Sequence, residues 1–145
     1  MQDFVHLHVH TYFSILDGQA NIKKLVDKAV GNGMRGMAIT DHGNMMGIKE
    51  FFDYCKKVNG KRKENGEEPF KPIFGCEMYV VRNNRRLTDR DKDKGDSRGN
   101  HLIVLAKNKK GYHNLIKLVS KAWIDGFYGC PRTDHVELEK YHEGL

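Results

Sequence analysis

Long apolar runs and cysteine pairs are both missing from this sequence of 145 residues. No stretch approaches the roughly 20 apolar residues that a membrane-spanning helix needs, and the N-terminus lacks the basic start and apolar run of a secretory signal. The three cysteines, Cys55, Cys76 and Cys130, are an odd number with wide spacing, which argues against a disulfide framework. These absences exclude membrane and secreted proteins and predict a protein of the reducing cytoplasm.

The composition is that of a folded, mildly basic domain. Hydrophobic residues make up 39% and charged residues 30% of the chain, so the apolar content is too high for a wholly disordered protein. A domain of about 150 residues buries roughly two-thirds of the surface that its unfolded chain exposes. The net charge of +6 favours polyanionic partners, although mild basicity is common and is a weak indication by itself.

Apolar periodicity predicts strands that alternate with helices. Residues 4–11 alternate apolar and polar side chains, which is typical of a strand and places His6, His8 and His10 on one face. Asn21 predicts the N-cap of the helix that follows. Further patterns predict helices over 22–31, 46–58, 112–119 and 136–142, strands over 37–39, 72–81 and 102–106, and basic loops over 56–72 and 82–100.

Strands that alternate with helices indicate βαβ units and a mainly parallel sheet, so the predicted fold class is α/β. A complete parallel barrel usually needs about 250 residues, and this chain stops where another strand is due. We therefore expect residues 1–145 to be the first part of a larger fold. An excerpt of this kind leaves a sheet edge unpaired, which predicts self-association of the fragment.

Histidines and one glutamate fall at the ends of the predicted strands. His8 and His10 lie at the end of the first strand, His42 follows the second, Glu77 lies on the third, and His101 opens the fourth. In parallel α/β folds, residues at one end of the strands converge, and divalent metals accept imidazole nitrogen and carboxylate oxygen. A bridging carboxylate reduces the repulsion between neighbouring ions, and Glu77 is the natural bridge.

The remaining acidic and histidine residues need separate interpretations. Asp17 offers a further oxygen ligand in the loop after the first strand. Any single histidine is more often a satisfied or surface residue than a ligand. We give the structural interpretation to His113, His135 and His142, and we leave His6 outside the ligand set although it shares a face with its neighbours. It is the combination at successive strand ends that indicates a metal site.

Three motifs and the segment after them resemble the PHP (polymerase and histidinol phosphatase) domain. The similarity rests on LHVHTYFSILDG, AITDHGNM and PIFGCEMYV, followed by HLIVLAKNKKGYHNLIKLVS, and it spans essentially the whole chain. The stretch GYHNLIKLVSKAWIDGFYGCPRTD is similar to the branch found at the N-terminus of bacterial replicative DNA polymerases. The resemblance implies a distorted seven-stranded (β/α) barrel of TIM-like form, of which residues 1–145 are the N-terminal part.

The resemblance also implies a site for divalent metal ions, up to three in the complete domain, commonly zinc, manganese, iron or magnesium. Asp41 is implied to support the ligands by orienting ring or backbone groups. The remaining ligands of the family are expected after Leu145. Carried over position by position, the motifs place metal ligands at His8, His10, Asp17, His42, Glu77 and His101.

A site of this kind hydrolyses phosphoesters with a metal-activated water. In the polymerase branch the resemblance implies 3′–5′ exonuclease proofreading or pyrophosphate removal, attached to a DNA-directed DNA polymerase, with other replicase subunits as partners. The basic segments 56–63 and 82–98 are either non-specific contacts to the DNA backbone or solvated surface. Two alternatives stay open: a stand-alone phosphatase of the histidinol-phosphatase type, and a module that docks a separate proofreading subunit.

Overall fold

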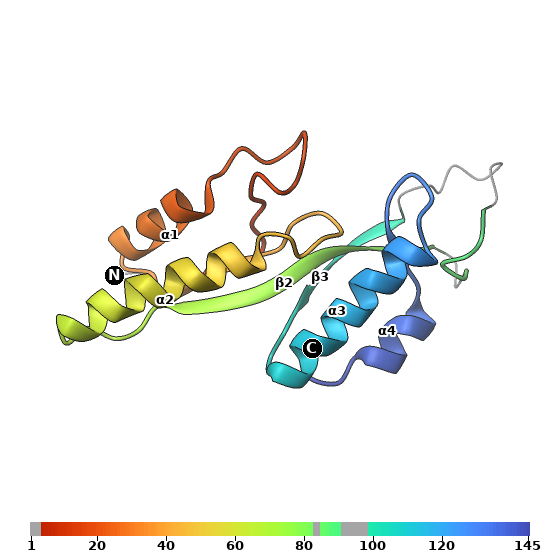
Figure 1. Ribbon diagram of the computed structural model, residues 1–145. Coiled ribbons are helices and arrows are strands. Elements are labelled where there is room, and N and C mark those ends of the chain that lie inside the picture. Colours follow the sequence, from red (N-terminus) through yellow and green to blue (C-terminus); the bar gives the residue numbers. More distant parts are fainter. Residues whose placement is uncertain (1–3, 83–84, 91–98) are drawn as a thin grey trace.

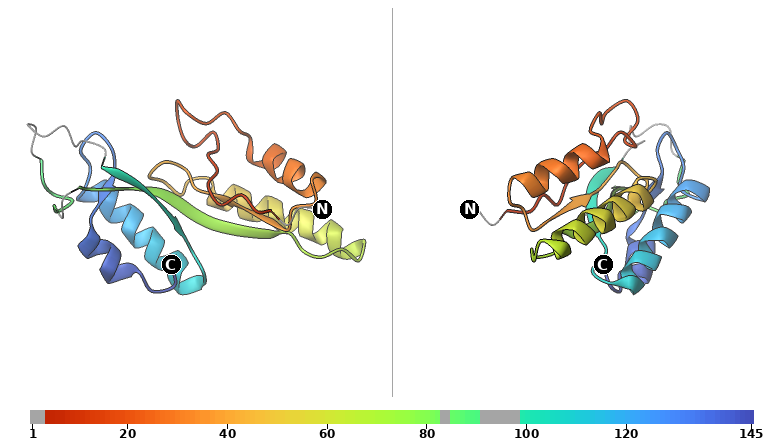
Figure 2. Two further views of the ribbon diagram at one scale, coloured as in Figure 1. Left: turned by 180° about the vertical axis from the view of Figure 1, so that it is seen from behind. Right: turned by 60° about the vertical axis from the view of Figure 1, so that its left-hand side comes forward.

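The computed structural model describes residues 4–82, 85–90 and 99–145. In chain order its elements are α1 (Ile22–Gly31), β1 (Gly36–Ile39), α2 (Ile48–Glu64), β2 (Lys71–Val80), β3 (Asn100–Leu105), α3 (Lys109–Ile124), β4 (Arg132–Thr133) and α4 (His135–Tyr141). The long strand β2 is the shared element, and the α1–α2 pair and the α3–α4 pair lie toward its opposite ends (Figures 1 and 2). Within the described residues, no helix combines the length and apolar character needed to cross a membrane.

The sheet is built around β2. The first half of β2 pairs in parallel with β1, and its second half pairs antiparallel with β3, which places Glu77 opposite Ile103. β4 adds a short parallel pairing at Tyr79 and Val80. The α/β class is therefore confirmed, but the prediction of a mainly parallel sheet is wrong for β3. Antiparallel neighbours need no helical crossover, and no helix occurs in the described part of the 81–99 connection.

Residues 4–11, predicted as a strand, run beside β1 without forming a regular strand. The amides of Ala38 and Thr40 donate to the carbonyls of His6 and Val9, both at 2.8 Å. The two acceptors are three residues apart in the first segment, whereas the two donors are two residues apart in β1. The first segment therefore contains one extra residue, which forms a β-bulge. The bulge breaks the simple alternation of faces, and the side chains of His8 and His10 contact Glu77 on β2.

Residues close in the sequence explain where the helices of the N-terminal half begin and how far they extend. α1 begins after Asn21, whose side chain accepts a hydrogen bond from the Lys24 amide at 3.2 Å, as predicted. α2 continues to Glu64, so the prediction of a loop from residue 56 onward is wrong for its first part. Lysine, arginine and glutamate are good helix formers. The side chain of Asn59 also fastens the helix to the backbone of Phe70, at 2.7 and 2.9 Å.

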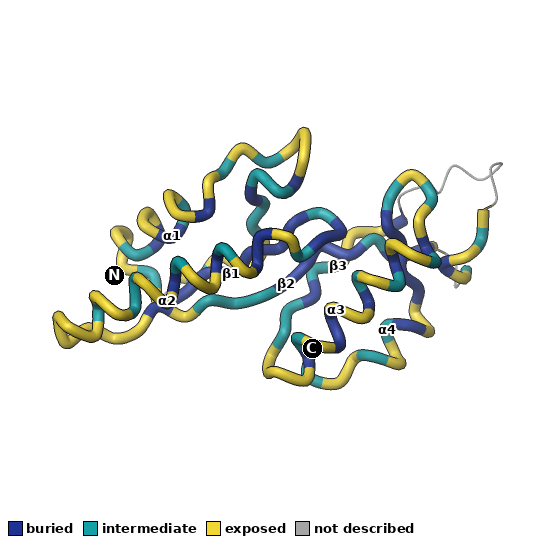
Figure 3. Tube along the Cα trace, viewed as in Figure 1, coloured by how far each residue is buried: buried dark blue, intermediate teal, exposed yellow. Residues whose placement is uncertain are grey.

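Two apolar clusters stabilise the fold. One packs α1 and α2 against β1 and includes Val26 and Phe51, and the other packs α3 against β2 and β3 with Leu115 and Leu118 fully buried. Truncating such a leucine to alanine typically costs about 2–5 kcal/mol. Figure 3 shows that buried positions follow β1, the middle of β2 and the inward faces of the helices. Side chains near the middle of β2 are therefore held on a well-packed scaffold.

Candidate metal centre

The centre of the candidate site is a buried carboxylate on β2. Glu77 is 1% exposed. Its amide donates to Asp41 O at 3.1 Å and its carbonyl accepts from Gly43 N at 2.8 Å, so the residues after β1 extend the parallel pairing as far as the site. A carboxylate is costly to bury as an anion unless hydrogen-bonding or cationic groups surround it. The groups that surround Glu77 are histidines.

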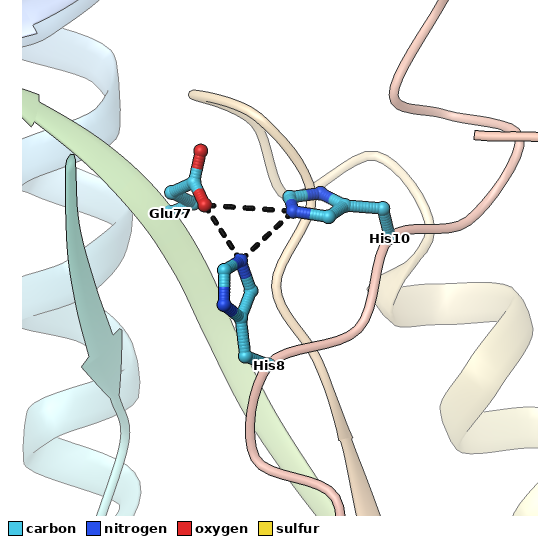
Figure 4. Close-up of side chains that lie close together, drawn as sticks. All are labelled: His8, His10 and Glu77. Carbon is cyan, nitrogen blue, oxygen red and sulfur yellow. Dashed lines mark hydrogen bonds and ion pairs between the residues drawn. The ribbon is translucent and has the colours of Figure 1, made fainter. Parts of the chain in front are cut away.

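Two histidines of the N-terminal segment meet one oxygen of this carboxylate (Figure 4). His8 Nε2 lies 2.6 Å from Glu77 Oε2 and 2.9 Å from His10 Nε2. His10 Nε2 lies 3.4 Å from the same oxygen. The three atoms thus face a common point, and all of them lie within 4.8 Å of one another.

The second oxygen of the carboxylate faces two other histidines. His42 Nδ1 lies 2.6 Å and His101 Nδ1 lies 3.0 Å from Glu77 Oε1. The opposite nitrogen of His42, Nε2, lies 2.5 Å from Asp17 Oδ2. Glu77 therefore stands between two pairs of imidazoles, one pair on each oxygen. All six residues predicted as ligands come together in this one cluster.

A buried serine and a buried aspartate lie behind the cluster. Asp41 accepts hydrogen bonds from the amide and hydroxyl of Thr11, at 2.6 and 2.8 Å, and from Ser14 Oγ at 2.7 Å. Since Ser14 has a single hydroxyl proton and donates it to Asp41, its oxygen can only accept from His10 Nδ1, which is 3.1 Å away. His10 therefore carries its proton on Nδ1, and its Nε2 lone pair faces the common point. Asp41 reaches the cluster through Ser14.

The sequence of the chain matches a known protein family. The model of the PHP domain matches residues 6–145. This chain belongs to the PHP domain family. The DNA polymerase III subunit alpha of Borreliella burgdorferi and that of Treponema pallidum are each 44% identical to it over 142 residues, which cover 98% of this chain and 11% of either relative. The Aquifex aeolicus DNA polymerase III subunit alpha is 43% identical over 147 residues, 99% of this chain and 12% of that protein. The chain therefore spans only a small part of the length of these relatives.

In this PHP chain, the pKa values of His10 and His42 are shifted in opposite directions. Burial lowers the pKa of His10 below its ordinary value, and the neighbouring His42 lowers it further. Burial also opposes the charged form of His42, but its hydrogen bonds with Asp17 and Glu77 outweigh burial and raise its pKa. Burial acts to raise the pKa of Glu77, but the hydrogen bond with His42 and the nearby charge of His101 outweigh it and hold this pKa low. These shifts favour the charged forms of Glu77 and His42 and the neutral form of His10.

The donor set of the PHP chain suits a divalent transition metal. His8 Nε2 has one proton to share between Glu77 Oε2 and His10 Nε2, whereas a cation at the common point can bind all three atoms. Two imidazole nitrogens and a carboxylate oxygen are ligands that zinc, iron and manganese accept. The side chains of His8 and His101 are 53% and 51% exposed, so the cluster is open to solvent on that side. PHP domains are generally metal-dependent, which agrees with this donor set.

Two residues of the PHP site were not predicted from the sequence. Ser14 and Thr11 contact Asp41, which lies 27 and 30 residues further along the chain, and no local pattern signals a contact over that separation. His6, which we left outside the ligand set, packs its ring against Phe4 at 4.7 Å between centroids.

Proposed function

We propose that this chain is the N-terminal part of the PHP domain of a bacterial replicative DNA polymerase and that it serves in DNA replication. The proposal is supported by identities of 43–44% to proteins named DNA polymerase III subunit alpha, over 98% or more of this chain. In this proposal, residues 1–145 supply the first strands and helices of a distorted (β/α)7 barrel. The parallel pairing of β2 with both β1 and β4 is compatible with part of such a barrel.

The activity that we assign to the site is metal-dependent phosphoester hydrolysis. The observation that carries it is the position of Glu77, because each of its two oxygens faces a separate pair of imidazoles. A carboxylate in this position can bridge two ions and offset their mutual repulsion. The site would hold up to three divalent ions of zinc, manganese, iron or magnesium. The ligands that we assign to these ions are His8, His10, Asp17, His42, Glu77 and His101.

The protein's own groups position the reacting centre. Ser14 holds the His10 ring with Nε2 toward the common point, and Asp17 and Glu77 hold both nitrogens of His42. Bound divalent ions supply an activated water and neutralise charge on a phosphate. The side chain of Asp17 is 67% exposed, so a phosphate can approach the cluster beside the Asp17–His42 pair. The substrates that we assign are the 3′ end of a DNA strand, as in proofreading, or pyrophosphate.

Partners follow from the basic surface and from the relatives. Basic residues 56–63 form the last turns of α2 and are mostly exposed, so they offer contacts to a DNA backbone without sequence specificity. The second basic segment, 82–98, lies partly outside the described residues. Within its described part, Arg86 pairs with Asp134 at 2.9 Å and Arg90 donates to Asp125 O at 2.9 Å, so these cations have partners inside the protein. Other replicase subunits complete the proposed partners.

Glu77→Gln in the complete polypeptide that carries this chain tests the proposed activity. The substitution keeps the shape of the side chain and removes the negative charge that would offset the repulsion between bound ions. Metal-dependent release of nucleotides from a 3′ end, or of phosphate from pyrophosphate, should fall by about 100-fold or more. DNA synthesis by the polymerase should be unaffected. Unchanged hydrolysis would place the hydrolytic centre elsewhere.

His113→Gln is the matched control, because His113 is exposed on α3 and lies outside the cluster. It should leave hydrolysis nearly intact, and an equal loss in both variants would indicate general destabilisation. Two further outcomes identify the alternatives. Hydrolysis of histidinol phosphate alone would indicate a stand-alone phosphatase, and no hydrolysis by the metal-loaded protein would indicate a docking module.

A further inference from the structure

A groove of about 340 Å³ adjoins the histidine cluster. His42 and Tyr79 form its wall toward the cluster, and the Tyr79 ring also contacts His101, with centroids 5.0 Å apart. The lining also includes the aromatic side chains of Trp123 and Phe127. The groove is therefore continuous with the candidate metal centre through His42.

The two aromatic rings form a stacked platform. Trp123 and Phe127 have ring centroids 5.4 Å apart and planes inclined by only 20°. Both side chains remain accessible, at 44% and 47% exposure. Stacked rings that stay exposed beside a reactive centre present flat apolar surface to a ligand.

The platform is fixed to the metal centre through one residue. Trp123 Nε1 donates to Gly43 O at 2.8 Å, while Gly43 N donates to Glu77 O at 2.8 Å. Gly43 has a φ of +58°, and a Cβ at this position would lie 2.5 Å from Pro131 Cγ. The loop after α3, which carries Phe127 and Pro131, therefore packs directly on the backbone of Gly43. This close packing links the orientation of the indole to the backbone that also carries the ligand cluster.

The loop that carries Phe127 is held in place by a buried cation. Arg132 is 2% exposed and donates from Nε to Gly126 O at 3.1 Å. It also donates from Nη2 to Leu87 O and Asp89 O, at 3.0 and 2.8 Å. The platform is therefore a preorganised part of the fold, which reduces the entropy that a ligand loses on binding.

We propose that Trp123 and Phe127 bind a base of single-stranded DNA by stacking, while the adjoining phosphate faces the histidine cluster. This inference rests on the proposed function and assigns DNA ends, not pyrophosphate, as the ligand, since pyrophosphate has no ring to stack. Apart from His42, at the end that adjoins the cluster, no acidic or basic side chain lines the groove within the described residues, which suits an uncharged base. The volume accommodates one base with its sugar.

Stacking in this groove is independent of base identity. The Asn44 side chain, the polar amide in the groove, already donates to Phe13 O and His42 O and accepts from Met46 N, at 3.0–3.1 Å. Both of its donor hydrogens are therefore used, and only one acceptor position on its oxygen is left to contact a base. Stacking on aromatic rings tolerates every base.

The single tryptophan of the sequence reports on this groove directly. The chain is titrated with the tetranucleotide (dT)4, with an abasic tetranucleotide and with pyrophosphate, all in EDTA so that neither metal nor hydrolysis contributes. We expect (dT)4 to quench the Trp123 fluorescence and to bind about tenfold or more tightly than the abasic strand. Pyrophosphate should leave the emission unchanged.

Variants of Phe127 separate stacking from folding. Phe127→Leu keeps an apolar side chain but loses the ring and should weaken (dT)4 binding about tenfold, whereas Phe127→Tyr should bind like the original chain. Phe52→Leu is the matched control, because Phe52 is also 47% exposed but lies on α2 away from this groove. Equal binding of (dT)4 and the abasic strand, or an unaltered Phe127→Leu, would overturn the inference and assign the groove to another occupant such as a polypeptide.

The two proposals fail separately. Loss of hydrolysis in Glu77→Gln together with unaltered binding by Phe127→Leu would retain the hydrolytic site and remove the platform. Weakened binding in Phe127→Leu together with full hydrolysis in Glu77→Gln would retain the stacking platform and remove the proposed hydrolytic site.

Discussion

A single hydroxyl group, that of Ser14, determines which nitrogen of His10 is free to bind a metal ion. Ser14→Ala removes the acceptor for His10 Nδ1–H, so the ring loses both its fixed proton position and its orientation. We expect the affinity of the chain for zinc, measured by calorimetry, to fall about 10–100-fold.

The Ser14→Ala variant should also lose about 1.5–3 kcal/mol in the free energy of unfolding, because the Ser14 hydroxyl donates to the buried Asp41 carboxyl group. Ser120→Ala, at an exposed position of α3, is the control and should bind zinc as the original chain does. Equal affinity in the two variants would show that Ser14 does not position His10.

In the absence of metal, His42 and His10 should titrate on opposite sides of the ordinary value of 6.5. His42, whose pKa is raised, should have its NMR titration midpoint above 6.5, and His10 should have its midpoint below. Because its pKa is raised by folding, protonated His42 stabilises the metal-free fold at low pH. This contribution to stability is lost as the pH rises through the pKa of His42. Asp17→Asn removes one of the hydrogen bonds that raise this pKa and should lower the midpoint of His42. A midpoint unaffected by that substitution would contradict the pairing.

At the scale of the elements, the turn after β1 depends on glycine, whereas the middle of α2 does not. Gly43 has a positive φ and a rigid proline ring against its α-carbon, so Gly43→Ala should lower the free energy of unfolding by about 1–2 kcal/mol or more. Gly60 lies within α2 with open space around the position of a Cβ, so Gly60→Ala should raise it by about 0.5–1 kcal/mol. Urea denaturation measures both, and a loss of stability in both variants would contradict this account.

Elements with local signals were predictable from the sequence. The Asn21 cap and the apolar stripe of α1 lie close together in the chain, and the predicted bounds of β1, β2 and α4 match the structure within two residues. The direction of β3 and the bulge before β1 depend on partners far away in the sequence, which periodicity does not report. The end of α2 was predicted too early because a polar, basic composition was interpreted as a loop.

The cluster itself was predictable because its residues lie on successive chain segments that pair side by side. The HxH pair, His42, Glu77 and His101 were expected to converge, and they do. Ser14 and the Trp123–Phe127 platform were not expected, since each depends on a contact between distant segments.

For the molecule as a whole, exposed apolar surface predicts self-association. Within the described part of the chain β3 pairs only with β2, and a groove of about 650 Å³ lined by Phe74, Leu105 and Tyr112 lies beside them. Open strand edges and apolar grooves favour contacts between copies. Light scattering should show dimers or larger species that increase with protein concentration, and a monomer over a wide concentration range would contradict this prediction.

The central claim is that the cluster around Glu77 binds divalent metal ions. The most direct measurement is the metal content of the untagged chain after incubation with zinc or manganese and removal of excess ion, compared with Glu77→Gln and with His113→Gln. The account predicts bound metal in the original chain and in His113→Gln, and strongly reduced metal in Glu77→Gln, because that variant lacks the charge shared by both imidazole pairs. Metal-free protein in all three samples, or equal metal in all three, would contradict it.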